Sequence, residues 1–209
     1  DLIYLYGANK TKDYKMYSEE ADAISLRMNR KPVTSDNPSN LDPVTGINNN
    51  KGMMNEYASK KGMKESHFTT VTTIEIDNFS KSNRPYSQEF TQSILKKVAF
   101  TISLHEQAAD VIARTDYNQF AIILSRANKE QAYKDIDIIR QSIAEIKFKS
   151  PATGAVVVTV SGGYVVKPNN VSLDESIRES KKVLAKAIEH GGNRIYQIKD
   201  LQESEYAEG

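Results

Sequence analysis

The stretch VIARTDYNQFAIIL, from Val111 to Leu124, decides how the rest of the chain must fold. Two apolar runs flank a short polar centre, Asp116-Tyr117-Asn118, a pattern typical of two antiparallel strands joined by a tight turn. Such turns favour glycine, or an Asn-Gly or Asp-Gly pair, because their backbone needs positive φ angles. A tyrosine stands in the middle of this turn instead. The stretch predicts a hairpin that is either an ordinary surface turn or a rebuilt catalytic one.

The composition indicates a globular chain. Hydrophobic residues make up 39% and charged residues 26% of the 209 residues, so a packed core is expected. The 28 basic and 27 acidic residues leave a formal net charge of +1, and no stretch mixes Lys and Arg with aromatic residues, so nucleic acid is not an expected partner. The absence of cysteine excludes disulfides and thiolate chemistry.

The sequence contains no segment that would place it in a membrane. No apolar run approaches the roughly 18 residues of a membrane span, and no signal-peptide pattern opens the chain. The chain begins at Asp1 rather than at methionine. We therefore expect a cytoplasmic domain of a longer protein, whose upstream part is a sensor or a membrane anchor.

Residues 1–40 are predicted to form a helix followed by a linker. Apolar side chains recur there three or four residues apart, on one helical face: Tyr14, Tyr17, Ala21, Ile24 and Met28. Two interpretations stay open, a helix packed on its own domain or a heptad-like connector that pairs two copies into a homodimer. The Pro-, Ser- and Asn-rich stretch after it indicates a linker. We expect the domain proper over residues 41–200 and a tail over residues 201–209.

Strand and helix patterns alternate along the domain. Besides the hairpin, runs rich in Val, Ile and Thr predict strands over residues 67–77, 155–166 and 193–198. Helical spacing covers residues 51–61, 87–104, 128–146 and 172–190. Asn128 and Ser172 open their helices with capping-box patterns. This order predicts an α/β or α+β fold, with helices packed on a mixed sheet.

Five fragments of the chain resemble, in order, the motifs of GGDEF domains, the bacterial diguanylate cyclase family. They are LDPVTGINNN at residues 41–50, TIEIDNFSKSN at 73–83, ARTDYNQFAIIL at 113–124, VTVSGGY at 158–164 and HGGNRIY at 190–196. The resemblance implies a palm-like domain with a mixed, mostly antiparallel sheet flanked by helices. It also implies a reaction in which two domains of a dimer condense two GTP molecules into cyclic di-GMP, with two divalent cations.

The resemblance places the family's metal-binding segment on residues 75–77. Glu75 takes the position of the first metal carboxylate, and Ile76 that of a ligand through its backbone carbonyl. Asp77 matches the second aspartate of the segment. Mg²⁺ is expected here only together with a bound nucleotide, and no other cofactor is expected. The plainer reading of Glu75 is a strand-end acid turned to solvent.

The signature that gives the family its name is replaced in this chain. Asp116 and Tyr117 stand where the family has two glycines, and Asn118 and Gln119 stand where it has two acids. An amide carries no charge and accepts no proton, and loss of a general base alone costs about 10²- to 10⁴-fold in rate. We expect the Tyr117 side chain to obstruct the usual nucleotide pose.

The positions for base recognition and product inhibition are altered as well. Asn83 matches the base-reading asparagine of the family, but Gln92 stands where the family has an aspartate. A glutamine offers one acceptor and a donor, so selectivity for guanine is not secured. The product-inhibition motif R-x-x-D reads QAAD from Gln107 to Asp110, without its arginine. We expect no tight capture of cyclic di-GMP there.

Two function hypotheses follow from the resemblance and the lost residues. The first is a catalytically impaired GGDEF-like signalling module of a larger bacterial protein, which contacts an adjacent sensor or output domain in a cyclic di-GMP context. The alternative is a domain that still binds GTP or ATP, as a sensor, a residual diguanylate cyclase or a nucleotide hydrolase. In that case Glu75, Asp77 and Asp116 would share one cation.

Overall fold

A computed structural model describes residues 37–61, 68–79 and 86–201. The predicted N-terminal helix, its pairing into a homodimer, Asn83 and the tail beyond Leu201 lie outside the described residues. The domain limits near residues 40 and 200 stay predictions.

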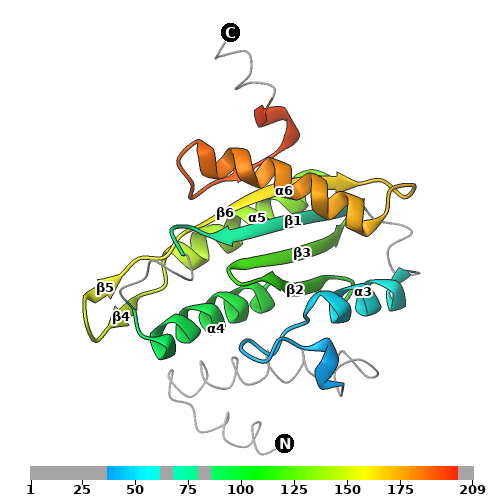
Figure 1. Ribbon diagram of the computed structural model, residues 1–209. Helices are drawn as coiled ribbons and strands as arrows, with labels where there is room; N and C mark the ends of the chain where they lie inside the picture. Colours follow the sequence, from blue (N-terminus) through cyan, green and yellow to red (C-terminus); the bar gives the residue numbers. More distant parts are fainter. Residues whose placement is uncertain (1–36, 62–67, 80–85, 202–209) are drawn as a thin grey trace, which may run out of the picture.

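Five strands form one sheet in the order β2-β3-β1-β6-β7 (Figure 1). The strands are β1 Phe68–Ile76, β2 Val111–Asp116, β3 Gln119–Arg126, β6 Val160–Lys167 and β7 Ile195–Tyr196. β1 pairs antiparallel with β3 and β6, and β2 pairs antiparallel with β3, whereas β6 and β7 are parallel. The predicted mixed and mostly antiparallel sheet is confirmed.

The hairpin predicted from VIARTDYNQFAIIL forms β2 and β3, with Tyr117 and Asn118 between the strands. β3 lies inside the sheet and is buried on both faces. Phe120, Ile122 and Leu124 belong to one core, and Ala121 and Ile123 belong to the other. This double burial explains why FAIIL is continuously apolar and does not alternate with polar residues.

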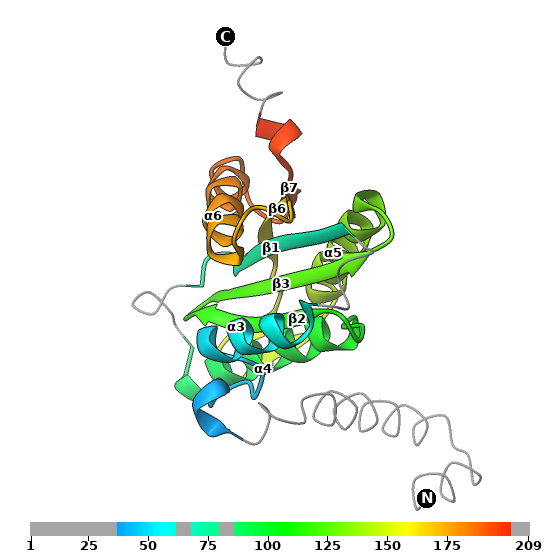
Figure 2. The same ribbon diagram turned by 90° about the vertical axis from the view of Figure 1, so that its right-hand side faces the viewer.

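α-Helices cover both faces of the sheet. They include α3 Asn50–Ser59, α4 Gln88–Leu104, α5 Lys129–Ala144 and α6 Leu173–Glu189. α4 and α5 pack into one core, and α3 and α6 pack into the other (Figure 2). The predicted caps are confirmed, since the Asn128 side chain accepts from the backbone N–H of Gln131, and that of Ser172 from the N–H of Glu175.

The single strand predicted over residues 155–166 is wrong. The chain there forms β5, Gly154–Val156, and after a break β6. β5 pairs with β4, Phe148–Ser150, in a separate two-stranded sheet. The sequence hides the break because AVVVTV is β-branched almost throughout, although Val157 in the break is 75% exposed. The last strand is also shorter than predicted, because Asn193 adopts a positive φ of 48°.

The buried phenol of Tyr164 lowers the stability of the fold at alkaline pH, where the phenol ionises in the unfolded chain. Its hydroxyl donates to the backbone carbonyl of Lys129 at 2.6 Å, and the residue is 3% exposed. Burial, together with the charge of Glu130, raises the pKa of the Tyr164 phenol well above its ordinary value. The folded chain therefore holds this proton more tightly than the unfolded chain. Its stabilising effect is fully present below about pH 10 and is lost as the pH rises from there towards the folded-state pKa.

The Tyr164→Phe variant tests this dependence. We expect it to lose about 0.5–1.5 kcal/mol of unfolding free energy at pH 7, because one hydrogen bond is missing. Between about pH 9 and pH 11, however, it should lose less stability than the wild-type chain, because it has no phenol to ionise on unfolding. Urea unfolding followed by circular dichroism measures both quantities. Equal losses for the two proteins over that range would contradict the expected role of the phenol.

Candidate functional site

The turn between β2 and β3 lies directly beside the end of β1. Glu75 is the cross-strand partner of Gln119. The backbone N–H of Ile76 donates to the carbonyl of Asn118 at 3.0 Å. The structure therefore brings together the residues that the sequence assigned to the metal segment and to the catalytic turn.

The two amides of the turn donate hydrogen bonds inside the protein. The Nδ2 atom of Asn118 donates to the backbone carbonyl of Phe79 at 3.0 Å. The Nε2 atom of Gln119 donates to Oε1 of Glu75 at 2.9 Å. Carboxylates at these two positions could make neither bond, since an ionised acid only accepts. The two amides thus hold the turn to residues 75 and 79.

Tyr117 is held by two neighbours, Phe79 and Arg114. Its ring stacks on Phe79 with centroids 5.8 Å apart, and the Arg114 guanidinium carbon lies 5.6 Å from its centroid. Arg114 also donates to the Tyr117 carbonyl from Nε at 3.1 Å and from Nη2 at 2.7 Å. The same guanidinium forms an ion pair with Asp42 at 3.2 Å. We call residues 116–119 the locked turn, because these contacts fix its backbone and its bulkiest side chain.

Asp77 faces away from the locked turn. Its carboxylate accepts from the hydroxyls of Thr159 at 2.7 Å and Ser161 at 2.6 Å, and from the backbone N–H of Asn193 at 2.9 Å. Asp77 thereby ties the end of β1 to β6 and to the loop between α6 and β7. The sequence offered a signal for this role, because Thr159, Ser161 and Asn193 lie in the fragments VTVSGGY and HGGNRIY.

The oxygen atoms near the locked turn are engaged in hydrogen bonds, which does not favour binding of a divalent cation. Mg²⁺ prefers carboxylate, carbonyl and water oxygens. One oxygen of Glu75 already accepts from an amide N–H, and both oxygens of Asp77 are taken by other donors. Asp116 is exposed, and its carboxylate accepts from the Tyr117 N–H at 2.7 Å. In the part of the chain that the structure describes, no three His, Cys, Asp or Glu side chains are placed to hold a metal ion.

A pocket of about 330 Å³ opens beside the turn. Its lining includes Gln88 and Gln92 of α4, one helical turn apart, together with Tyr86, Arg114 and Tyr117. Gln92, at the family's base-reading aspartate position, and Tyr117, which we expected to obstruct the nucleotide, therefore line the same pocket. The amides of Gln88 and Gln92 make no hydrogen bond with the other described residues, whereas Arg114 is already paired. The polar groups left for a ligand include two neutral amides.

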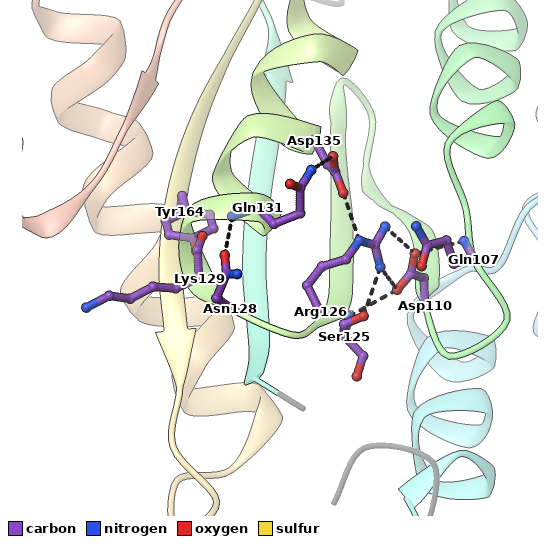
Figure 3. Close-up of polar contacts among 9 residues, drawn as sticks. All are labelled: Gln107, Asp110, Ser125, Arg126, Asn128, Lys129, Gln131, Asp135 and Tyr164. Atoms are coloured by element: carbon purple, nitrogen blue, oxygen red, sulfur yellow. Dashed lines mark hydrogen bonds and ion pairs between the residues drawn. The ribbon is translucent and has the colours of Figure 1, made fainter. Parts of the chain in front are cut away.

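The predicted product-inhibition position is part of a buried ion-pair network (Figure 3). Asp110 is 0% exposed, and its carboxylate accepts from Nη1 and Nη2 of Arg126 at 2.7 and 2.9 Å. The backbone N–H groups of Gln107 and Ser125 donate to the same carboxylate at 2.8 and 3.0 Å. Arg126 also donates from Nε to Asp135 at 2.8 Å. Burial lowers the pKa of Arg126, but its bonds to the two acids outweigh burial and raise that pKa overall.

This network was not predicted from the sequence. The sequence singled out Asp110 for its place in the family motif, but gave no sign that Arg126 is its partner. The pair fastens the start of β2 to the end of β3, and Asp135 extends the network to α5. Because Asp110 has four donors and no exposed surface, it supports the fold from the interior.

Residues 39–194 match the family described as "Diguanylate cyclase, GGDEF domain". Over 161 residues the chain is 25% identical to the probable diguanylate cyclase DgcT of Escherichia coli K12, which covers 76% of this chain and 36% of that protein. Over 165 residues it is 23% identical to an uncharacterized membrane protein of Staphylococcus aureus USA300, which covers 77% of this chain and 46% of that protein. The chain thus spans less than half the length of these relatives. None of the helices in the described residues is long and apolar enough to cross a membrane.

A solved structure shares the fold. The coiled coil and GGDEF domain of DgcB from Caulobacter crescentus, in complex with c-di-GMP, matches with a TM-score of 0.69 and 19% identity. That match covers 90% of this chain and 100% of the other. At this identity the similarity shows the fold alone. The family match, by contrast, spans well over half of the sequence. The chain therefore belongs to the GGDEF family of diguanylate cyclase domains.

Proposed function

We propose that this chain is a catalytically impaired GGDEF domain, which serves as a regulatory module of a larger bacterial protein in cyclic di-GMP signalling. The locked turn is the observation that carries this proposal. Asn118 and Gln119 donate to Phe79 and Glu75, where the family resemblance calls for free carboxylates. Neither amide can take a proton from an attacking hydroxyl, and neither adds negative charge for a cation.

The surroundings of the turn support the same proposal. Family members need bare backbone beside the nucleotide, but here the Tyr117 ring lies between Phe79 and Arg114. The nearest positive group is also committed, since Arg114 pairs with Asp42. A phosphate that approached the turn would have to displace an existing ion pair. Such a displacement weakens ligand binding by the free energy of the contacts that it breaks.

The proposed partners are neighbouring domains of the same protein. The chain spans less than half of its curated relatives, which supports a module that works with a sensor or output domain. The matching DgcB structure includes a coiled coil next to its GGDEF domain. This supports the proposal that the N-terminal helix predicted within residues 1–40 pairs two copies of the chain. A cytoplasmic location is part of this proposal.

An assay for cyclic di-GMP tests the proposed loss of activity. The purified chain is incubated with GTP and either Mg²⁺ or Mn²⁺, and the products are separated and identified by mass spectrometry. We expect no cyclic di-GMP above the level of a protein-free control. The Glu75→Ala variant serves as the second control, because any activity of the family type would need that carboxylate. Synthesis by the wild-type chain that disappears in Glu75→Ala would overturn the proposal.

The pocket beside the turn favours a second candidate function, binding of GTP or ATP without turnover. Gln88 and Gln92 line the pocket without a hydrogen bond to any other described residue, and Tyr117 lines it too. Calorimetric titration with GTP, ATP and cyclic di-GMP in Mg²⁺ tests it. A nucleotide sensor would bind one of them at micromolar concentration, and Gln92→Leu would weaken that binding about tenfold, equivalent to 1.4 kcal/mol. The absence of heat with all three ligands would contradict this second function.

A further inference from the structure

Among the described residues, strand β6 has an open edge beyond β7. β7 pairs only with Gly162 and Gly163, whereas β6 continues to Lys167 and is paired with β1 along its other edge. The N–H of Gly162 donates to the carbonyl of Arg194, on the β7 side, at 2.9 Å. Backbone polar groups alternate between the two edges of a strand, so those of Val166 point to the same side as those of Gly162. In the described residues no strand pairs with Val166 on that side.

A groove of about 560 Å³ runs along this open edge. It is lined by the C-terminal half of β6, the first turns of α5 and residues 197–199. Val166 and Ile198 expose 37% and 45% of their surface here, and Tyr133 also faces the groove. Figure 3 labels two of its lining residues, Lys129 of α5 and Tyr164 of β6. The β6 edge groove, as we call it, combines apolar walls with backbone groups of Val166 that no described strand pairs with.

The charged residues that line the groove are mostly positive, and Asp137 and Asp200 lie near Tyr133. Lys129, Lys134 and Lys199 line it and are exposed, and Glu130 is the one acid in its lining. None of the three lysines forms an ion pair with the described residues. A second copy of the chain would bring the same lysines to the same edge, so repulsion opposes edge-to-edge pairing of two copies. An acidic partner would instead meet complementary charge.

We propose that the β6 edge groove binds an extended, acidic peptide segment of a partner protein, which adds to the sheet as a strand next to β6. Main-chain bonds to Val166 supply the register, and alternate side chains of the segment contact Val166, Ile198 and Tyr133. Acidic side chains of the segment pair with the lysines at the rim. The proposal concerns a surface formed by β6 and α5 and is independent of nucleotide chemistry at the locked turn.

A synthetic peptide of about seven residues, with alternating glutamate and valine and a fluorescein label, serves as the probe. Fluorescence anisotropy measures its binding to the full chain. Val166→Pro removes the N–H that faces the groove, and it leaves the ladder with β1 intact because that N–H does not point to β1. We expect Val166→Pro to weaken binding at least tenfold. The matched Val166→Thr variant keeps the N–H and should bind as the wild-type chain does.

A methylated peptide and a charge-reversal variant provide two further tests. A peptide methylated on every second backbone nitrogen should lose binding to the unmodified protein, since it cannot complete a ladder, and this arm does not depend on how Val166→Pro folds. Lys129→Glu should weaken the acidic peptide about tenfold. Absence of binding, or binding that methylation leaves unchanged, would overturn the proposal. Concentration-dependent dimers that Val166→Pro abolishes would show that a second copy occupies the groove and would also overturn it.

Discussion

The Arg126→Met variant is expected to lose about 3–5 kcal/mol of unfolding free energy. Arg126 is 5% exposed and holds both oxygens of Asp110 at 2.7 and 2.9 Å, besides Asp135 at 2.8 Å. Methionine fills a similar volume but leaves the buried Asp110 carboxylate without its ion-pair partner. The two remaining donors, the N–H groups of Gln107 and Ser125, solvate that charge only in part. Urea unfolding followed by circular dichroism gives the change in free energy.

An exposed ion pair provides the control. Lys182 lies 3.8 Å from Glu179, and their side chains are 76% and 50% exposed. Lys182→Met removes the same kind of charge from a solvated site, so its effect should be close to zero. Similar losses for Arg126→Met and Lys182→Met would contradict the view that the buried pair fastens β2 to β3.

The Gln119→Glu variant should lose about 1–3 kcal/mol of unfolding free energy at pH 7. The change removes the N–H that Glu75 accepts at 2.9 Å and places a second carboxylate beside the first. Repulsion then raises the pKa of one of the two carboxyls above its ordinary value near 4.3. A raised folded-state pKa means that stability is fully present below the ordinary pKa and is lost as the pH rises through the raised one. The deficit should therefore shrink as the pH falls from 7 towards about 4.

Unfolding of Gln119→Glu, Gln119→Met and the wild-type chain at both pH values tests this expectation. Gln119→Met removes the same hydrogen bond without adding charge, so its deficit should be nearly independent of pH. Millimolar Mn²⁺ should stabilise Gln119→Glu alone, because paired carboxylates are good ligands for hard cations. Equal pH dependence of the two variants would refute the close approach of residues 75 and 119.

Much of the fold could be predicted from local patterns. The hairpin at Val111–Leu124 and the caps at Asn128 and Ser172 depend on neighbours within a few residues, which the sequence displays directly. The break between β5 and β6 could not be predicted in this way. It depends on which strand each segment pairs with, and a β-branched run is equally suited to one strand or to two.

In the site, too, contacts between distant segments could be predicted only where a family motif covers both residues. Alignment to family motifs brought Glu75 and Gln119 to one place, and the structure agrees that they meet. The motif fragments also contain Asp77 and its partners Thr159 and Ser161. They gave no sign that Asp110 has Arg126 as its partner, because Arg126 lies in none of the fragments. The assignment of metal-binding and nucleotide-binding roles stays a prediction.

The burial of β3 on both faces bears on how a domain of this kind can change its role. A shift of the strand by one residue would exchange Phe120 and Ile122 with Ala121 and Ile123 between two cores of different shape. The burial of alternate residues in two different cores therefore holds the register of the strand. Substitutions at the tip can therefore change the chemistry of the turn while the two cores keep β3 in its place. The part of the hairpin that sets the fold and the part that faces a ligand can change independently.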